Sequence, residues 1–561
     1  MMSAEGKPVP EVLPVGYYLE HFRTLLDAVE ERYGDLLNDA EKSFVSTFRA
    51  LPVPGQRLYV RLISRQGPVF RSDRLTYPEI LNLPEVAEVL VQRRFLSRDD
   101  PEWLEAAFAL LTSPELKEVG AQFSIACAGL RKGEIQAVLQ KALTPELLSA
   151  ALLIRFHWLT PLGTDMIRVF RLLFFGTSEP DLTAFVLSDL GKVTFESYPL
   201  MSSHRLFTCR GEVDRAVKLS ELREELYTVL EEQEENEDTS LTVERLTGSL
   251  PPAAGHPLLC RWRRRFLEMA GRFWERKGRA ERALELYADP ETLPARERRA
   301  RLLLRQGNES EALRQCEEIL ATPRDPAEEE VAAALAGRLR SGGRRSARFC
   351  PLVERLSLPA DRDDRIEARV LDALIRRGEE GFEAENRFWN SLFGLVFWEI
   401  IFLPVPRAFG HPFQSSPSDL FTSGFRQARE EPIQRRLSEL VAGESWRSKV
   451  LSLYDQKRGV ANALVNWEAI SRPTLERVLE VLPSRHLMMI CDRLGRNPGG
   501  FTSGFPDLFL FRSEPPGYEL AEVKSPGDRL QDNQRSWMRF FAAQGIPCRV
   551  IQVEFEESVV G

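Results

Sequence analysis

The chain has 561 residues, which is too long for one hydrophobic core, so we expect several domains. Its 43% hydrophobic and 28% charged residues are those of an ordinary globular protein. A net charge of −8 argues only mildly against a nucleic-acid partner. In a multidomain chain, binding depends on where the charges lie and less on their sum.

The seven cysteines and six histidines are dispersed along the chain, and no Cys-x-x-Cys pair occurs. This pattern argues against a disulfide framework and against a His/Cys zinc site. Any metal should therefore have oxygen ligands, which favours Mg²⁺ or Mn²⁺. We expect no small-molecule cofactor besides this metal. The most apolar segment, Leu392 to Val405, is short and contains Glu399, and Met1 to Pro8 lacks the apolar core of a signal peptide. We therefore expect no membrane partner.

Residues 1–105 are interpreted as a helical, winged-helix-like region. An apolar stripe from Tyr17 to Val29 predicts the first of two helices within residues 1–50. The run Arg57–Ile63, rich in β-branched and aromatic residues, predicts a strand, and Leu75–Phe95 predicts a further helix.

Residues 106–150 contain two predicted short helices. Thr112 and Glu115 form a capping box at the start of the first, and Pro114 suits its first turn. Arg131 and Lys132 stand at the start of the second. This arrangement resembles the SAP module, which binds the DNA backbone, and an ordinary helical hairpin is the alternative.

Residues 151–250 are expected to form a helical connector, and residues 251–345 contain a weak repeat. Gly278 and Gly307, 29 residues apart, each precede an alanine by five residues. The pattern resembles tetratricopeptide repeats, although their usual period is about 34 residues. Such repeats make protein partners possible. The region is also rich in arginine, with clusters at residues 261–265, 296–299 and 338–348. Arg261, Arg263, Arg264 and Arg265 are predicted to bind DNA phosphates, and solvated helix faces are the alternative.

The last part of the chain, residues 375–561, is expected to be one α/β domain. An amphipathic helix is predicted over Glu383–Phe402, and a Gly-rich loop leads into Asp507. A strand, a turn, a second strand ending at Lys524, a helix and a final strand follow. This β-β-α-β order is the core of the restriction-endonuclease-like fold. The sequence thus predicts a multidomain, predominantly α-helical protein with this α/β domain at its C-terminal end.

Three charged residues in this domain indicate phosphodiester chemistry. Glu522 and Lys524 are two apart in a strand and point the same way, so both can reach the site that Asp507 enters. Two carboxylates can hold a divalent cation, and the ammonium can steady a water molecule or a phosphate oxygen. A Glu-x-Lys sequence alone is common in proteins. The motif becomes specific for this chemistry through its context, which extends from the Gly-rich loop through Asp507 and both strands to Gln534.

That string resembles the VRR-NUC branch of the PD-(D/E)xK nuclease superfamily. Segments Phe393–Phe402 and Pro412–Leu420 resemble the Fanconi-associated nucleases. So does the order of the domains, which implies that residues 1–105 are a DNA-binding region, followed by the SAP-like module, the helical repeats and the VRR-NUC domain. The resemblance implies that Asp507, Glu522 and the carbonyl of Val523 bind metal and that Lys524 orients or activates water. It also implies a further upstream glutamate, for which Glu385 fits best and Glu383 is the rival, and a supporting role for Gln534.

The resemblance further implies a metal-dependent, structure-selective DNA nuclease. It would cut 5′-flap and branched DNA, with 5′-to-3′ exonuclease activity, in interstrand-crosslink repair. The alternatives are a nuclease for four-way junctions or single-stranded ends, and an inert scaffold built on the repeats. The expected location is the cytoplasm with the nucleoid in a bacterium and the nucleus in a eukaryote.

Overall fold

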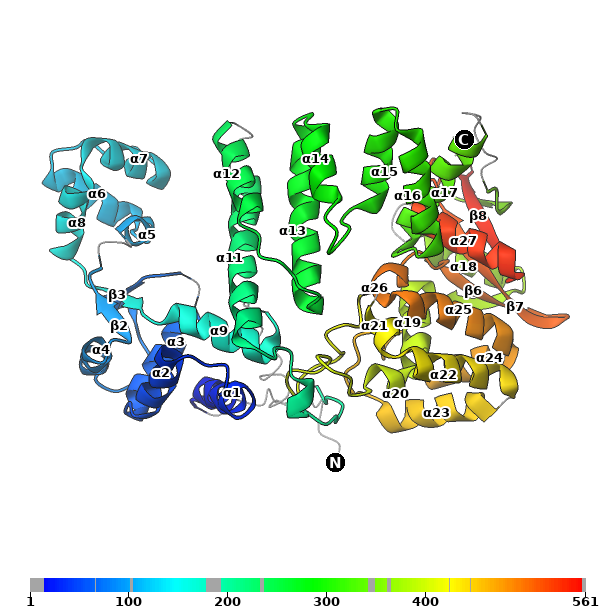
Figure 1. The fold of residues 1–561 in the computed structure, drawn as a ribbon, viewed down its shortest axis with the longest axis horizontal. Coiled ribbons are helices and arrows are strands. Elements are labelled where there is room, and N and C mark those ends of the chain that lie inside the picture. The colour runs from blue at the N-terminus through cyan, green and yellow to red at the C-terminus, as the bar shows by residue number, and fades with distance from the viewer. Residues whose placement is uncertain are drawn as a thin grey trace. The chain divides into compact units, whose positions relative to one another are not determined.

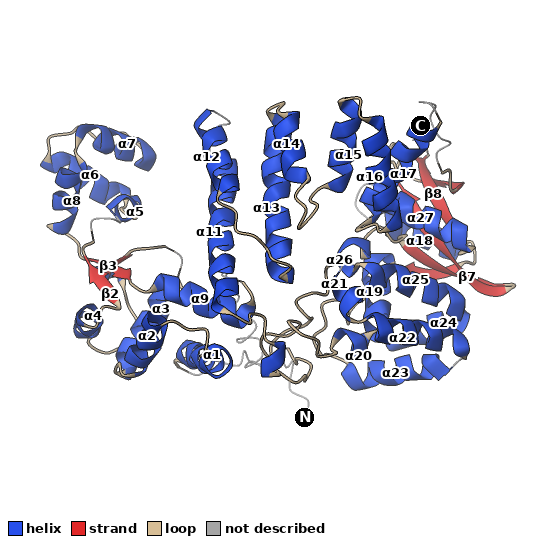
Figure 2. Cartoon of the chain, in the orientation of Figure 1, coloured by secondary structure: helices blue, strands red, loops and turns tan. Residues whose placement is uncertain are grey.

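The computed structural model describes residues 15–556 except 66, 101–103, 178–192, 233–236, 342–348, 361–364, 423 and 444. The chain divides into two compact units, Met1–Leu190 and Gly191–Gly561. Most elements are helices, as predicted, and the described strands form two sheets (Figures 1 and 2). Within the described ranges, no helix combines the length and the apolar character needed to cross a membrane.

The first unit begins with helices around a small sheet. They are α1 (Tyr17–Tyr33), α2 (Asp39–Arg49), α3 (Val53–Ile63) and α4 (Leu83–Gln92). Strands β1 (Phe70–Arg71), β2 (Leu96–Arg98) and β3 (Trp158–Pro161) pair antiparallel in the order β1-β3-β2. The two helices predicted within residues 1–50 are confirmed.

Two predictions in this region need correction. The segment Arg57–Ile63, predicted as a strand, lies within helix α3. Its fully buried residues Leu58, Tyr59 and Leu62 follow helical spacing, and this spacing outweighs their β propensity. The helix predicted over Leu75–Phe95 forms only as α4, because Asn82 begins it in a left-handed conformation with φ 53°.

Four short helices follow, and α9 then completes the described part of the unit. They are α5 (Leu104–Ala109), α6 (Ser113–Gln122), α7 (Lys132–Ala142), α8 (Pro145–Leu153) and α9 (Thr164–Phe175). The predicted capping box is present, since the Thr112 amide donates to Glu115 Oε2 at 2.7 Å. The pair α6 and α7 packs through Leu116, Val119, Ile135 and Leu139. Its assignment as a SAP-like module stays a prediction.

The second unit starts with a helical region. It contains α11 (Arg210–Glu232), α12 (Glu237–Gly248), α13 (Pro257–Arg276), α14 (Ala280–Tyr287), α15 (Arg296–Arg305), α16 (Glu309–Ala321) and α17 (Pro326–Arg340). The predicted connector is less helical than expected, because no described residue between Phe175 and Arg210 belongs to an α-helix.

The sequence repeat marks two helical hairpins. Gly278 (φ 70°) and Gly307 (φ 79°) form the turns of α13–α14 and α15–α16, where a left-handed backbone favours glycine. The alanines that follow them, Ala283 and Ala312, are buried between the paired helices. The hairpins are therefore explained by the sequence, whereas the relation to tetratricopeptide repeats stays a prediction.

The C-terminal sheet has the order β4-β8-β7-β6-β5. Its strands are β4 (Leu352–Leu358), β5 (Glu380–Glu383), β6 (Leu508–Ser513), β7 (Pro516–Lys524) and β8 (Cys548–Phe555). Strands β6 and β7 pair antiparallel, and α27 (Asp532–Gln544) connects β7 to the parallel strand β8. The predicted β-β-α-β order is confirmed. The sheet also includes β4, which precedes the predicted domain start at residue 375.

Helices pack on both faces of this sheet. The first of them forms one hydrophobic cluster with β4, β6, β7 and β8, and the others build a larger cluster on the opposite face among the described residues. They are α18 (Ile366–Arg376), α19 (Glu385–Val396), α20 (Trp398–Ile401), α21 (Gly424–Ala428), α22 (Glu430–Ala442), α23 (Ser445–Lys457), α24 (Arg472–Val481), α25 (Ser484–Arg496) and α26 (Pro498–Phe501). The helix predicted over Glu383–Phe402 begins at Glu385, because the preceding residues pair with β6, and it is interrupted at Phe397.

Candidate active site

The end of strand β7 brings three polar side chains together. Glu522 and Lys524 lie on one face of the strand, and Lys524 Nζ is 2.9 Å from Glu522 Oε1. Gln534 reaches them from the first turn of α27: its Nε2 donates to Glu522 Oε1 at 2.6 Å, and its Oε1 accepts from Lys524 Nζ at 2.9 Å. Gln534 therefore holds both the carboxylate of Glu522 and the ammonium of Lys524 through its side-chain amide.

Asp507 enters the same site from the residue before β6. Its Oδ2 accepts from the Val523 amide at 2.7 Å. Its carbonyl accepts from the amides of Ala384 and Glu385, at 2.8 and 3.1 Å, so the start of α19 is bound to the same residue. Gly504 (φ 94°) lets the preceding loop pass close to α27, where a Cβ atom would lie 2.8 Å from the Asn533 carbonyl carbon.

The two carboxyl groups are held in an environment that disfavours their charge. Burial raises the pKa of Asp507 to about 6, and the hydrogen bond from Val523 only partly offsets this. Burial and the nearby charge of Asp507 raise the pKa of Glu522 to about 8, against the opposing effect of Lys524. A cation between them would favour the ionised forms.

One oxygen in this site has no hydrogen-bond partner. Glu522 is 1% exposed, and its Oε2 is buried and unpaired among the described residues. A free, buried carboxylate oxygen beside a second carboxylate fits a hard divalent cation. No group of three or more His, Cys, Asp or Glu side chains in the described chain is arranged to hold an ion. Asp507 and Glu522 therefore need other oxygen donors, and the carbonyl of Val523 is the predicted one.

The structure distinguishes the two upstream glutamates. The charge of Glu385 contributes to the raised pKa of both Asp507 and Glu522, which places this exposed side chain beside the site. Glu383, in contrast, accepts from Arg365 Nη2 at 2.7 Å and is neutralised there. Glu385, whose amide donates to the Asp507 carbonyl at 3.1 Å, is the better candidate for the further contributor, and its role stays a prediction.

Sequence reasoning missed Glu367, on the first turn of α18. Its charge also raises the pKa of Asp507, so a further carboxylate lies near the site. It stands far upstream of the motif on a helix of ordinary composition, and its sequence context carries no signal of a site.

Three of the six predicted DNA-binding residues make contacts with other elements of the fold. Arg131 is exposed, whereas Lys132 donates to the Ala109 carbonyl at 2.8 Å and connects α7 to α5. Arg261 donates to the Ser418 carbonyl at 3.2 Å, and Arg263 pairs with Asp289 at 2.6 Å. The last two contacts hold the fold together and leave these arginines poorly placed to bind phosphate.

Arg264 and Arg265 instead line a cleft of about 780 Å³. The cleft lies between α13, α15, the start of α17, the loop before Asp507 and the N-terminal end of α27. Arg265, Arg272 and Arg301 on its wall are exposed, and none has an ion-pair partner in the described part of the chain. Acidic residues also line the cleft, so its wall is not uniformly basic. The three arginines make up only part of that wall.

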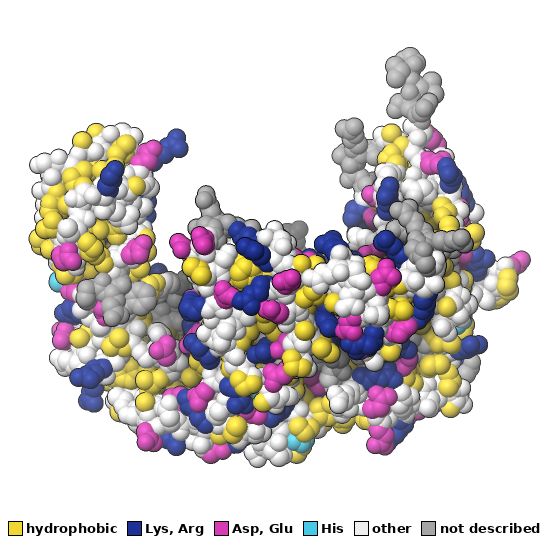
Figure 3. All heavy atoms as spheres, turned by 45° about the horizontal axis from the view of Figure 1, so that its top comes forward, with side chains coloured by type: hydrophobic (Ala, Val, Ile, Leu, Met, Phe, Trp, Pro, Cys, Tyr) yellow, Lys and Arg dark blue, Asp and Glu magenta, His cyan; other side chains and the backbone are white. Residues whose placement is uncertain are grey.

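The wider surface has no uniform charge. Figure 3 shows Lys and Arg side chains interspersed with Asp and Glu on the face drawn. The remaining basic run is split, since Arg340 pairs with Glu317 and Arg344, Arg345 and Arg348 lie outside the described residues. Of the arginine clusters predicted from the sequence, the one at residues 261–265 contributes Arg264 and Arg265 to a cleft that the start of α27 also lines.

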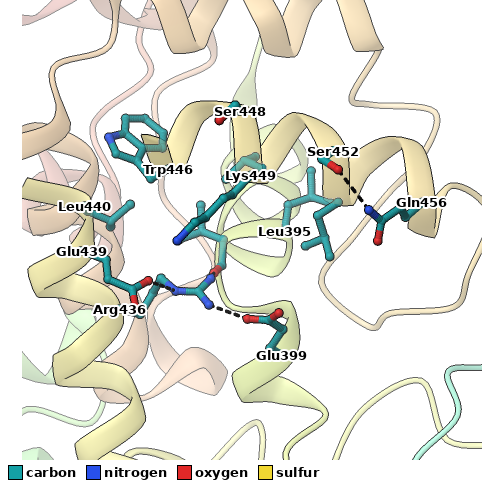
Figure 4. A pocket seen from close by; sticks show the side chains of 13 residues that line it. Leu395, Glu399, Arg436, Glu439, Leu440, Trp446, Ser448, Lys449, Ser452 and Gln456 are labelled. Carbon is teal, nitrogen blue, oxygen red and sulfur yellow. Dashed lines mark hydrogen bonds and ion pairs between the residues drawn. The ribbon is translucent and has the colours of Figure 1, made fainter. Parts of the chain in front are cut away.

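A separate pocket of about 460 Å³ lies between α19, α22 and α23 (Figure 4). Arg436 on its wall pairs with Glu399 at 2.6 Å and Glu439 at 3.1 Å, as the figure shows. Its charges are thus largely neutralised within the pocket, and none of the residues at the predicted site lines it.

Comparison with known proteins agrees with these features. The family models described as "FAN1, HTH domain" and "VRR-NUC domain" match residues 16–97 and 443–555. The Fanconi-associated nuclease 1 homolog of Pseudomonas aeruginosa is 32% identical over 558 residues, covering 96% of each chain. Human Fanconi-associated nuclease 1 is 25% identical, and the match covers 96% of this chain and 62% of the human protein.

Solved structures show the same likeness over nearly the whole chain. The crystal structure of paFAN1 bound to 2nt 5′-flap DNA with gap superposes with a TM-score of 0.85 at 31% identity, covering 98% of this chain and 100% of that one. The complex with 1nt 5′-flap DNA gives 0.82 at 31% identity. The chain therefore belongs to the Fanconi-associated nuclease family and is a DNA nuclease with a C-terminal VRR-NUC domain.

Proposed function

We propose that this nuclease uses the site around Asp507 and Glu522 to cut 5′-flap and branched DNA in interstrand-crosslink repair, with both endonuclease and 5′-to-3′ exonuclease activity. The observation that carries the proposal is the unpaired, buried Glu522 oxygen beside Asp507, with Lys524 fixed by Gln534. The similar chain solved with 5′-flap DNA supports the choice of substrate.

The residues of the site have distinct tasks in hydrolysis. Water attacks the phosphorus and gives up a proton, the bond to the leaving oxygen breaks, and that oxygen takes up a proton. Lys524 is placed to orient the attacking water or to neutralise a phosphate oxygen, and Gln534 keeps its ammonium in position. Asp507 and Glu522 would hold the divalent metal on which this family depends, which supplies Lewis-acid stabilisation of the transferring phosphate. The all-oxygen donor set favours Mg²⁺ or Mn²⁺.

The arginine cleft supplies a route for the substrate. Arg265, Arg272 and Arg301 line the same cleft as Gln531 to Asn533, which precede Gln534 at the start of α27. Unpaired guanidinium groups bind phosphate oxygens without reading sequence, which suits recognition by DNA shape.

The test is cleavage of a labelled 5′-flap duplex in Mg²⁺ or Mn²⁺ by wild type, Asp507→Asn and Lys524→Ala. We expect each variant to lose about 10²-fold or more in rate, because each removes a group that acts on the transition state. DNA affinity in Ca²⁺ should stay close to wild type, which separates chemistry from binding.

Two results would contradict the proposal. Equal cleavage by wild type and Asp507→Asn would remove the assigned site. Faster cleavage of four-way junctions or single-stranded ends than of the flap would change the assigned substrate.

A further inference from the structure

Arg493 of α25 is a cation buried inside the nuclease core. The residue is 4% exposed, and the rings of Phe501, Trp537 and Phe540 surround its guanidinium at 4.9, 5.0 and 4.7 Å. Such a cation needs a counter-charge to be stable in an apolar setting.

That counter-charge comes from the helical repeats. Glu329 on α17 accepts from Arg493 Nη2 at 2.5 Å and from Ser536 Oγ at 2.8 Å. Arg493 also donates to Ser536 Oγ at 2.7 Å, so the three side chains form a closed triad. The triad connects α17 through Glu329, α25 through Arg493 and α27 through Ser536. Figure 1 shows α17 beside α27.

Helix α27 is therefore held on two sides. Ser536 and Gln534 are two residues apart, about 200° around the helix, so one faces α17 while the other faces the active site. A second contact on the α17 side joins Glu330 to Arg539 at 2.9 Å.

The same surface of the repeats also fixes the loop that leads to Asp507. Asn497 Nδ2 donates to the Arg324 carbonyl on the repeat side at 2.6 Å, and from α27 Trp537 Nε1 donates to the Ser503 carbonyl of the same loop at 3.1 Å. At Gly500 an added Cβ would lie 2.0 Å from the Arg324 carbonyl oxygen, so the two backbones are in direct contact.

We infer that Glu329 is a positioning residue for the nuclease reaction: through Arg493 and Ser536 it sets α27 so that Gln534 holds Glu522 and Lys524. The helical repeats thus form part of the catalytic unit, in addition to any contact they make with DNA. The inference rests on the proposed function of the Asp507 site.

The experiment is a double-mutant cycle in the full chain, with Glu329→Gln, Gln534→Ala and the combination, on the labelled 5′-flap duplex. Glu329→Gln should lower kcat by about tenfold, as loss of a supporting contact around a metal site does, with KM unchanged. The combination should fall no further than Gln534→Ala alone, because both act through one group. Glu329→Asp should recover most of the rate. Glu317→Gln, which removes an exposed carboxylate paired with Arg340 on the neighbouring helix, is the matched control and should act as wild type.

Wild-type kcat in Glu329→Gln, a change in KM alone, or effects that multiply in the combination would overturn the inference. If Glu329→Gln does not fold, Ser536→Ala breaks the same connection with a smaller change and enters the same cycle. Failure of the proposed function is seen separately, as cleavage by Asp507→Asn equal to wild type.

Discussion

The two upstream glutamates differ in their side-chain contacts, and this difference predicts which of them helps to bind the metal. The Glu385 amide donates to the Asp507 carbonyl, and its carboxylate is exposed. Among the described residues, that carboxylate accepts one hydrogen bond, from Asn386 Nδ2 at 3.2 Å. Glu383, two residues earlier, is neutralised by Arg365. A free carboxylate can help to recruit a cation, whereas a neutralised one contributes little.

Glu385→Gln should therefore lower flap cleavage by about tenfold or more, whereas Glu383→Gln should stay within about twofold of wild type. Initial rates measured over a Mn²⁺ titration would check this, and the Glu385 variant should need more metal for half-maximal rate. The reverse order of the two variants would show that the assignment of Glu385 is wrong.

Most of the residues that meet at the site could be predicted from the sequence because they belong to one continuous string. Asp507, Glu522, Lys524 and Gln534 lie on neighbouring strands and the next helix, so strand periodicity and turn signals bring them together. Glu367 could not be predicted, since its approach to Asp507 depends on how α18 packs on the sheet. Spacing along the chain does not encode that packing.

Among the helices and strands, the sequence predicted those features that depend on interactions between residues close together in the chain. The capping box of α6 and the turn glycines of the hairpins were visible because hydrogen bonds and backbone angles within a few residues determine them. Strands β4 and β5 were missed. β4 is an edge strand that buries only Leu356 and Leu358 and exposes its first half, with Leu352 69% exposed, and β5 has four residues, so each carries a short buried pattern or none. Their place depends on pairing with β8 and β6 far along the chain.

The α6 cap also has a measurable dependence on pH. Glu115 accepts from Thr112 and, at 2.6 Å, from the buried Arg71. Burial opposes its ionisation, but these hydrogen bonds outweigh burial and lower the pKa of Glu115 to about 2. The folded state thus keeps the carboxylate ionised down to that pH, while the unfolded chain takes up a proton near its ordinary value of 4.5. The contribution to stability is complete above about pH 4.5 and is lost as the pH falls toward 2.

Glu115→Gln should reduce the free energy of opening of α6 by about 1 to 2 kcal/mol at pH 7, the usual size for a capping contact, because solvent screens part of the interaction between Glu115 and Arg71. Hydrogen exchange of the α6 amides would measure it. The difference from wild type should narrow as the pH falls below about 4.5. Glu118→Gln, on the same helix with a carboxylate 63% exposed, should show little change. A difference independent of pH would contradict the role of the Glu115 charge.

For the whole molecule, a net charge of −8 coexists with a nuclease that must hold a polyanion. We propose that the arginine cleft reconciles the two, because binding then depends on a few cations without ion-pair partners among the described residues and not on the sum of charges. Phosphate contacts release counterions, so the slope of log Kd against log salt concentration counts them.

The triple variant Arg265→Ala, Arg272→Ala, Arg301→Ala should bind flap DNA more weakly and should reduce that slope by about two to three, since each phosphate contact contributes about 0.7 to 0.9. Fluorescence anisotropy of a labelled flap in Ca²⁺ over a salt series would measure both quantities. A matched control replaces Arg340, Arg355 and Arg435, which removes the same charge from side chains already paired with carboxylates. If both triple variants changed the slope equally, net charge would explain the effect and the cleft would have no special part in binding. A change confined to the cleft variant would mean that these few arginines hold the strand beside Gln534, in a protein whose overall charge repels DNA.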